Sequence, residues 1–229
     1  MKLSFSTKGW SERSWDELVG LAEEMDFNGI EVFDAAKNEE LVGKGAPFHI
    51  YNTHATAREL REKGLHAATA ESCTGGMIAE RLTNVPGSSE VFGYGFVTYA
   101  EAAKQKLLGV PAGLIERYNV VSGPVAAAMA FGAAKAAGAE LAVGITGIAG
   151  PGGALPGKPV GTVYLAGADA RTNTGHVMRL TLGGYRERSV IRARAAMYAL
   201  DMLRRMALGL PVPDSLTVTP DTPAETMDM

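Results

Sequence analysis

The chain has 229 residues, a formal net charge of -3, and ordinary globular shares of apolar (46%) and charged (21%) residues. This composition excludes wholesale disorder, and an acidic chain is unlike the basic proteins that bind nucleic acid non-specifically. No apolar run is long enough for a membrane helix, and the N-terminus lacks the apolar core of a signal peptide. A single cysteine, Cys73, and four histidines give neither a disulfide nor a zinc-ligand spacing. We therefore expect a cytoplasmic protein with no metal and no membrane or nucleic-acid partner.

The first 50 residues predict a small β-α-β unit and a linker. Residues 3–6 and 27–33 read as strands, and between them Ser14 and Glu17 have the spacing of a capping box at a helix start. Residues 34–52 are polar and predict the linker. The unit resembles the opening of a xylose-isomerase-like barrel, but one unit cannot close eight strands and the acid and histidine metal ligands of an isomerase are missing. We expect an appendage that packs on the core or mediates association, without a metal or isomerase role for Glu31.

Residues 53–209 predict a single larger domain in which strands and helices alternate. That alternation is typical of a three-layer α/β/α sandwich with a mixed, mostly parallel sheet. The last two strands are close enough in the chain to be antiparallel. Residues 210–229 carry proline, threonine and aspartate without an apolar period, and predict a disordered tail. The predicted helices cover 53–63, 77–82, 101–108, 111–118, 122–137 and 188–208, and the predicted strands 65–70, 95–99, 141–145, 161–166 and 176–182.

The most informative local pattern is a buried strand, the run Glu71-Ser72-Cys73-Thr74-Gly75-Gly76, and then a helix. The glycines allow backbone N–H groups to turn toward a bound group, and the helix adds its positive end. We expect substrate contacts from Thr74, Gly75 and Gly76. Ser72 itself fits three roles: nucleophile, phosphate ligand or helix N-cap. The patterns of a P-loop and of a Gly-x-Ser-x-Gly elbow are absent.

A serine nucleophile needs a base, and no histidine lies near these motifs. Tyr99 ends the next predicted strand and Lys104 lies on the helix after it, and a lysine can act as the base if burial lowers its pKa. The alternative is that Lys104 is an ordinary solvated lysine on a helix. Cys73 is interpreted as a small packing residue rather than a nucleophile.

A second glycine-rich stretch, residues 144–162, follows a buried strand. Open α/β sheets bind ligands at such positions, so we expect substrate contacts from Thr146, Gly147 and Gly150. A purely structural crossover loop is the alternative interpretation.

Taken together, these runs resemble the CinA C-terminal domain family, whose stand-alone form is a nicotinamide-nucleotide amidohydrolase. The resemblance covers about residues 53–208. It implies hydrolysis of the carboxamide of nicotinamide mononucleotide to nicotinate mononucleotide and ammonia, with no metal and no cofactor. By the same resemblance, Ser72 is the nucleophile, and Tyr99 and Lys104 complete the site. The matching segments are 70–76, 86–89, 95–99, 104 with 107–110, 121–122, 144–153 and 158–162.

Two segments depart from the family pattern. The family has Tyr-Ser-Asn-Glu-x-Lys where this chain has Tyr99-Ala100-Glu101-Ala102-Ala103-Lys104. Before the last helix the family has Gly-Asp/Asn-Arg, and here Arg186, Arg188 or Arg192 could contact the substrate. The expected partners are a small nucleotide and further copies of the chain in a homo-oligomer. A non-catalytic nucleotide-binding or regulatory module remains the alternative to the enzyme.

Overall fold

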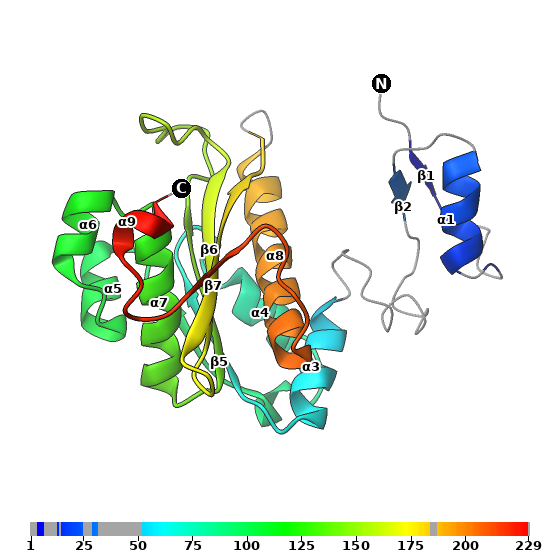
Figure 1. Cartoon of the computed structure of the whole chain (residues 1–229), viewed down its shortest axis with the longest axis horizontal. Helices are drawn as coiled ribbons and strands as arrows, with labels where there is room; N and C mark the ends of the chain where they lie inside the picture. Colours follow the sequence, from blue (N-terminus) through cyan, green and yellow to red (C-terminus); the bar gives the residue numbers. More distant parts are fainter. Residues whose placement is uncertain are drawn as a thin grey trace. The chain divides into compact units, whose positions relative to one another are not determined.

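The computed structural model describes residues 4–6, 13, 15–24, 29–31, 52–183 and 187–228, and the chain divides into two units, Met1–Tyr51 and Asn52–Met229. In the first unit, β1 (Ser4–Ser6) and β2 (Gly29–Glu31) pair in parallel, and α1 (Trp15–Glu24) lies between them in the chain (Figure 1). This is the β-α-β unit that the sequence predicts. Ser14 and residues 34–51 of the linker lie outside the described residues, and the last residue of the predicted linker, Asn52, begins α3.

The second unit is built on a six-stranded sheet in the order β4-β3-β5-β6-β7-β8. The pairs β3–β4 and β3–β5 are parallel, and the pairs β5–β6, β6–β7 and β7–β8 are antiparallel. The mixed sheet is confirmed, with the parallel pairing confined to one side of it. The strands are β3 (Ala67–Glu71), β4 (Phe92–Val97), β5 (Leu141–Gly147), β6 (Thr162–Asp169), β7 (Thr174–Thr181) and β8 (Leu216–Val218).

Helices cover both faces of the sheet, which confirms the three-layer sandwich (Figure 1). One face packs against α3, α4 and α8, and the other against α5, α6, α7 and α9. The helices are α3 (Asn52–Glu62), α4 (Met77–Thr83), α5 (Glu101–Leu108), α6 (Ala112–Tyr118), α7 (Gly123–Ala137), α8 (Arg188–Leu208) and α9 (Ala224–Met227), with a short 3-10 helix η2 (Ser88–Glu90) before β4.

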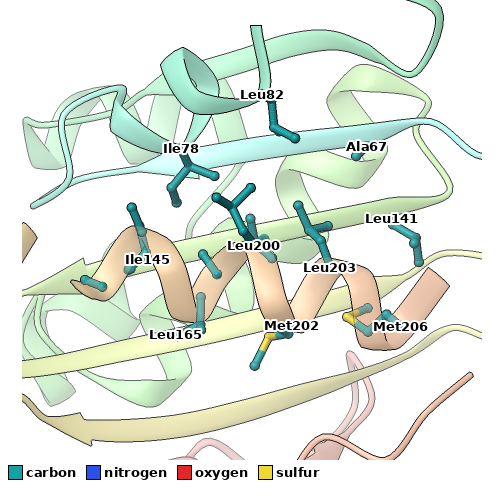
Figure 2. Packing of buried hydrophobic residues seen from close by; sticks show 14 of the residues in the cluster. Ala67, Ile78, Leu82, Leu141, Ile145, Leu165, Leu200, Met202, Leu203 and Met206 are labelled. Carbon is teal, nitrogen blue, oxygen red and sulfur yellow. The ribbon is translucent and has the colours of Figure 1, made fainter. Parts of the chain in front are cut away.

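The core on the first face is dominated by α8, which lies along the sheet (Figure 2). Leu200 and Leu203 of this helix are fully buried against Leu141 and Ile145 of β5 and their neighbours. Alternate residues of β5 point to opposite faces, as expected of a strand with two covered faces. The helix predicted over residues 188–208 is therefore confirmed.

On the second face, α7 approaches the sheet closely because the facing residues are small. A Cβ atom at Gly144 would lie 2.5 Å from the carbonyl oxygen of Ala126 and 2.6 Å from the nitrogen of Ala130, both in α7. Only glycine permits this approach, which fixes α7 across the middle of the sheet. The glycine at 144 is thus explained by packing.

The prediction of a disordered tail over residues 210–229 is wrong. Within residues 210–229, β8 pairs with the edge of β7 and α9 follows it. Val218 and Met227 are buried in the core of the α7 face, at 1% and 7% exposure. Composition missed this because a three-residue strand and a one-turn helix are too short to show a period, and their stability comes from the contacts they make with distant residues.

Candidate active site

Ser72 directly follows β3, in the parallel part of the sheet. Its N–H donates to the carbonyl oxygen of Ile145 in β5, which continues the strand pairing to this residue. Its side chain is 8% exposed, so it lies just beneath the surface. The N-cap role is not what the structure shows, since the N-cap residue of α4 is Gly76.

Glu71, and not Ser72, caps the N-terminus of α4. Its carboxylate, fully buried, accepts hydrogen bonds from the N–H groups of Gly76, Ile78 and Ala79 at 2.9–3.0 Å. The positive end of α4 is therefore already neutralised by an acidic side chain from the chain itself. Ser72 is left free of any capping contact.

Lys104 lies in α5, and its ammonium nitrogen reaches Ser72. The Nζ atom is 3.1 Å from Ser72 Oγ, 2.6 Å from the carbonyl oxygen of Thr98 and 3.2 Å from that of Tyr99. The residue is fully buried, and no carboxylate in the described part of the chain lies within ion-pair distance of it. Burial lowers the pKa of Lys104, while the charge of Glu101 opposes the shift. The solvated-lysine interpretation is thus excluded.

The three oxygen neighbours of Lys104 define which proton can move. A neutral amine has two N–H groups and one lone pair. The two carbonyl oxygens, of Thr98 and Tyr99, can only accept hydrogen bonds, so they take the two N–H groups. The lone pair is then left facing Ser72 Oγ, which carries the only hydrogen among these three oxygens. A neutral Lys104 is therefore arranged to accept the proton of Ser72.

Tyr99 takes part in two different ways. Its carbonyl oxygen helps to hold Lys104, whereas its phenol ring is 64% exposed and its hydroxyl lies 3.4 Å from Nη2 of Arg188. The hydroxyl therefore lies at the surface beside Arg188, while Lys104 contacts Ser72 directly. A part for this hydroxyl in the reaction stays a prediction. Tyr99 and Arg188 form the exposed rim of the site. Arg188 also donates to the carbonyl oxygen of Gly150 at 2.8 Å, which links this rim to the glycine-rich stretch 144–162.

The turn after Ser72 has two backbone donors that bond to no other residue. The N–H of Gly75 donates to the carbonyl oxygen of Ser72, and that of Gly76 to Glu71, so neither is available to a ligand. Within the described residues, the N–H groups of Cys73 and Thr74 donate to no other residue. The backbone donors that the sequence led us to expect at Gly75 and Gly76 are therefore instead those of Cys73 and Thr74.

Cys73 is a packing residue, as its sequence context suggested. Burial raises the pKa of its thiol to about 12, so the thiol stays protonated at neutral pH and is a poor nucleophile. It belongs to the core on the α8 face. The structure thus gives no support to a nucleophilic Cys73, and the role of Ser72 as nucleophile stays a prediction.

The remaining predicted contact residues have structural partners. Thr146 Oγ1 donates to the carbonyl oxygen of Val120, a Cβ atom at Gly147 would lie 2.7 Å from a methyl of Val163, and one at Gly150 would lie 2.5 Å from Val160. Packing accounts for these positions, and their part in substrate binding stays a prediction. The side-chain hydroxyl of Thr74, by contrast, is buried without a hydrogen-bond partner.

Sequence reasoning missed Glu71 and left Arg192 as one of three alternatives. A charged residue at the end of an otherwise apolar strand was the available signal for Glu71. Arg192 donates to the carbonyl oxygens of Cys73 and Thr74 at 3.0 and 2.7 Å, from a position 118 residues further along the chain than Thr74. Arg186 lies outside the described residues.

Two kinds of feature are absent from the described residues. These residues contain no group of three or more histidine, cysteine, aspartate or glutamate side chains placed to hold a metal ion. Nor do they contain a helix of the length and apolarity needed to cross a membrane.

The fold and the site define an α/β sandwich protein with a serine and a buried lysine in contact at the end of a parallel strand. The family model described as the CinA C-terminal domain matches residues 52–207, and the chain belongs to this family.

Curated relatives and solved structures agree with this family. The chain is 50% identical over 160 residues to a putative competence-damage inducible protein of Symbiobacterium thermophilum, covering 68% of the chain and 38% of the relative. It is 54% identical over 154 residues to a CinA-like protein of Geobacter sulfurreducens, covering 67% and 36%. The chain thus spans little more than a third of the length of these two relatives.

Among solved structures, the competence/damage inducible protein CihA of Agrobacterium tumefaciens is 41% identical, with a TM-score of 0.61 and coverage of 69% of this chain and 96% of that one. A CinA superfamily protein of Escherichia coli is 35% identical, with a TM-score of 0.64 and coverage of 70% and 90%. The second unit therefore corresponds to nearly the whole of these solved chains.

Proposed function

We propose that this chain hydrolyses the carboxamide of nicotinamide mononucleotide, releasing ammonia and nicotinate mononucleotide, with Ser72 as nucleophile and Lys104 as base. The observation that carries the proposal is the 3.1 Å contact between Lys104 Nζ and Ser72 Oγ in a buried setting. A serine hydroxyl is a weak nucleophile until an adjacent base removes its proton. The amide as the bond that is cleaved, and the nucleotide as substrate, rest on the family resemblance.

The first half of the reaction makes an acyl-enzyme. Neutral Lys104 accepts the proton of Ser72 as Oγ attacks the carboxamide carbon. The carbonyl oxygen of the substrate becomes an oxyanion, for which the unused N–H groups of Cys73 and Thr74 are suitable donors. When the tetrahedral intermediate collapses, the C–N bond breaks, and Lys104 returns the proton to the departing nitrogen, which leaves as ammonia.

The second half repeats the same proton transfers with water. Lys104, neutral again, takes a proton from a water molecule that attacks the ester carbon, and the proton then passes to Ser72 Oγ as the C–O bond breaks. The product is a carboxylic acid, which releases its proton to water to become the carboxylate, and the enzyme is restored. One base serves both halves because its position between two carbonyl oxygens is unchanged.

The rim of the site suits a nucleotide carrying a phosphate. Arg188 is exposed, lies beside the Tyr99 ring, and offers a guanidinium that matches phosphate geometry. The exposed ring of Tyr99 can stack on the positively charged pyridinium of the substrate. The N-terminus of α4, occupied by Glu71, is not available to the phosphate.

The test is ammonia release from nicotinamide mononucleotide by the whole chain, with Ser72→Ala as the variant. We expect Ser72→Ala to lose roughly a hundredfold or more in kcat while keeping the thermal midpoint of the wild type. Ser88→Ala is the matched control, since Ser88 is buried to the same extent, outside the site, in η2. Near wild-type turnover by Ser72→Ala would remove the serine from the mechanism.

A non-catalytic nucleotide-binding module is the second candidate, and the same contact bears on it. A charged Lys104 would find hydrogen-bond acceptors for all three of its N–H groups, on Ser72, Thr98 and Tyr99. In that case the lysine would only hold the turn. Binding of nicotinamide mononucleotide without any release of ammonia would favour this candidate.

A further inference from the structure

The two unused donors of the Ser72 turn lie in peptide groups whose carbonyl oxygens are held. The peptide between Ser72 and Cys73 has its oxygen bonded to the N–H of Gly75 at 3.1 Å. The peptide between Cys73 and Thr74 has its oxygen bonded to Nε of Arg192 at 3.0 Å. In a planar trans peptide the C=O and N–H point in opposite directions, so holding the oxygen also aims the hydrogen.

Arg192 also holds the next peptide of the turn. Its Nη2 atom donates to the carbonyl oxygen of Thr74 at 2.7 Å, so one guanidinium fixes two successive peptide planes from the side of α8. In the peptide between Thr74 and Gly75, whose oxygen bonds to Arg192, the N–H of Gly75 points away from Arg192 and reaches the carbonyl oxygen of Ser72. By the same geometry, the N–H of Thr74 is turned away from α8.

Gly75 is the residue that makes room for this arrangement. It has a φ of +61°, and a Cβ atom there would lie 3.2 Å from Nη2 of Arg192. A side chain would therefore crowd the guanidinium as well as strain the backbone. The family motif in the turn and the arginine on α8 form one unit, although they are far apart in the sequence.

We propose that Arg192 is a positioning residue that presets the N–H of Thr74 directly, and the N–H of Cys73 through the bond from Gly75 to the carbonyl oxygen of Ser72, to receive the oxyanion formed when Ser72 attacks. The inference rests on the proposed role of Ser72 as nucleophile. Preset donors stabilise charge in the transition state without reorganising at the moment of reaction, so their loss lowers kcat and leaves KM nearly unchanged. A guanidinium is required because its planar fork can serve two oxygens at once, which an ammonium at the end of a lysine does poorly.

The experiment uses Arg192→Ala, Arg192→Lys and the control Arg194→Ala, whose residue lies on the same helix and makes no described contact with the Ser72 turn. Two rates are measured for each: ammonia release from nicotinamide mononucleotide, and covalent labelling of Ser72 by a fluorophosphonate, followed by intact mass. In the labelling step the Oγ–phosphorus bond forms, fluoride leaves, and Lys104 takes the proton. Labelling needs the oxyanion donors but not the natural substrate.

We expect Arg192→Ala to lower both kcat and the labelling rate by roughly ten- to a hundredfold, part of the loss typical of removing an oxyanion donor. KM should stay within about threefold. Added methylguanidine should restore part of both rates in Arg192→Ala, whereas Arg192→Lys, which keeps the charge and the aliphatic stem, should remain slow. Arg194→Ala should behave as wild type.

Three results would overturn the inference. The first is a wild-type labelling rate in Arg192→Ala or in a folded Arg192→Lys, and the second is a loss that methylguanidine does not restore in a variant that keeps its thermal midpoint. The third is a wild-type protein whose Ser72 is not labelled at all. If the wild type is labelled but releases no ammonia, the proposed substrate is wrong, and the inference is still decided by the labelling rates.

Discussion

The Nζ atom of Lys104 lies 3.1 Å from Oγ of Ser72, although the two residues are 32 positions apart in the chain. They meet because β3 and β4 are parallel neighbours, so the segments that follow the two strands leave the sheet at the same edge. Ser72 comes directly after β3, and α5 folds back from the end of β4 with Lys104 on its buried side. The contact is therefore a product of the sheet topology.

The first prediction concerns the protonation of Lys104. Burial lowers its pKa, and the base is the deprotonated form, so kcat should rise with pH through that lowered pKa. Lys104→Arg should lose roughly a hundredfold or more in kcat at every pH, since a guanidinium does not deprotonate. A Lys104→Arg variant that keeps most of its kcat and changes mainly in KM would show that the lysine only attracts the substrate phosphate. Steady-state kinetics of this variant and of Lys104→Met across a pH series separate the two roles.

A second prediction follows from Glu101 at the start of α5. Its negative charge raises the pKa of Lys104 and so opposes the effect of burial. Glu101→Gln should lower the pKa of Lys104 further, which moves the rising limb of the kcat–pH profile to lower pH. Glu116→Gln, at an exposed position of α6, is the control and should leave the profile in place. A shift of the Glu101→Gln profile to higher pH, or none at low salt, would contradict the expected coupling.

The third prediction concerns the uncapped start of α5. Ala100 occupies the N-cap position with an extended backbone (φ -78°, ψ 151°) and supplies no capping side chain, where the family pattern has serine. Because Ala100 is exposed, Ala100→Ser should add a cap without a clash and stabilise the protein by about 1 kcal/mol. Calorimetry should then show a thermal midpoint about 2–4 °C higher. Ala102→Ser, inside the same helix, is the control and should lower stability slightly, by roughly half a kcal/mol.

The fourth prediction concerns the first unit. The proposed site lies wholly in Asn52–Met229, and none of its described contacts involves residues 1–51. Removing residues 1–51 should therefore leave a folded protein with kcat and KM within about twofold of the whole chain. Circular dichroism, steady-state kinetics and sedimentation of both forms are the measurements. An unfolded or inactive truncated protein would mean that the first unit belongs to the core or to an oligomer interface.

The sequence predicts most of the architecture because its signals are local. The period of apolar residues in 188–208 and the strand–helix alternation up to residue 182 were enough for the layers and the mixed sheet. The contact between Ser72 and Lys104 was expected through the family resemblance, since no spacing rule relates residues 32 positions apart.

What could not be predicted depends on tertiary contacts with the backbone. Glu71 is an exception, since it bonds N–H groups only five to eight residues away and its charge at the end of a buried strand was a usable signal. Arg192 bonds the carbonyl oxygens of Cys73 and Thr74, far from it in the chain, and such backbone partners leave no trace in the sequence. The same holds for β8, which is too short to carry a period. Glu71 and Arg192 are also the residues that hold the peptide groups of the Ser72 turn.

The pairing of β8 with β7 affects how readily the protein aggregates. The family match ends at residue 207, so the strand that covers this side of the sheet comes from outside the matched region. If residues 210–229 were lost, the backbone groups of β7 opposite β8 would lie on an open edge, ready to pair with a strand of another molecule. The far side of the sheet, where Ser72 and Lys104 lie, would be untouched. Forms of this chain that lack residues 210–229 should therefore keep the site but aggregate more readily. The last residues thus protect the protein from aggregation through β7.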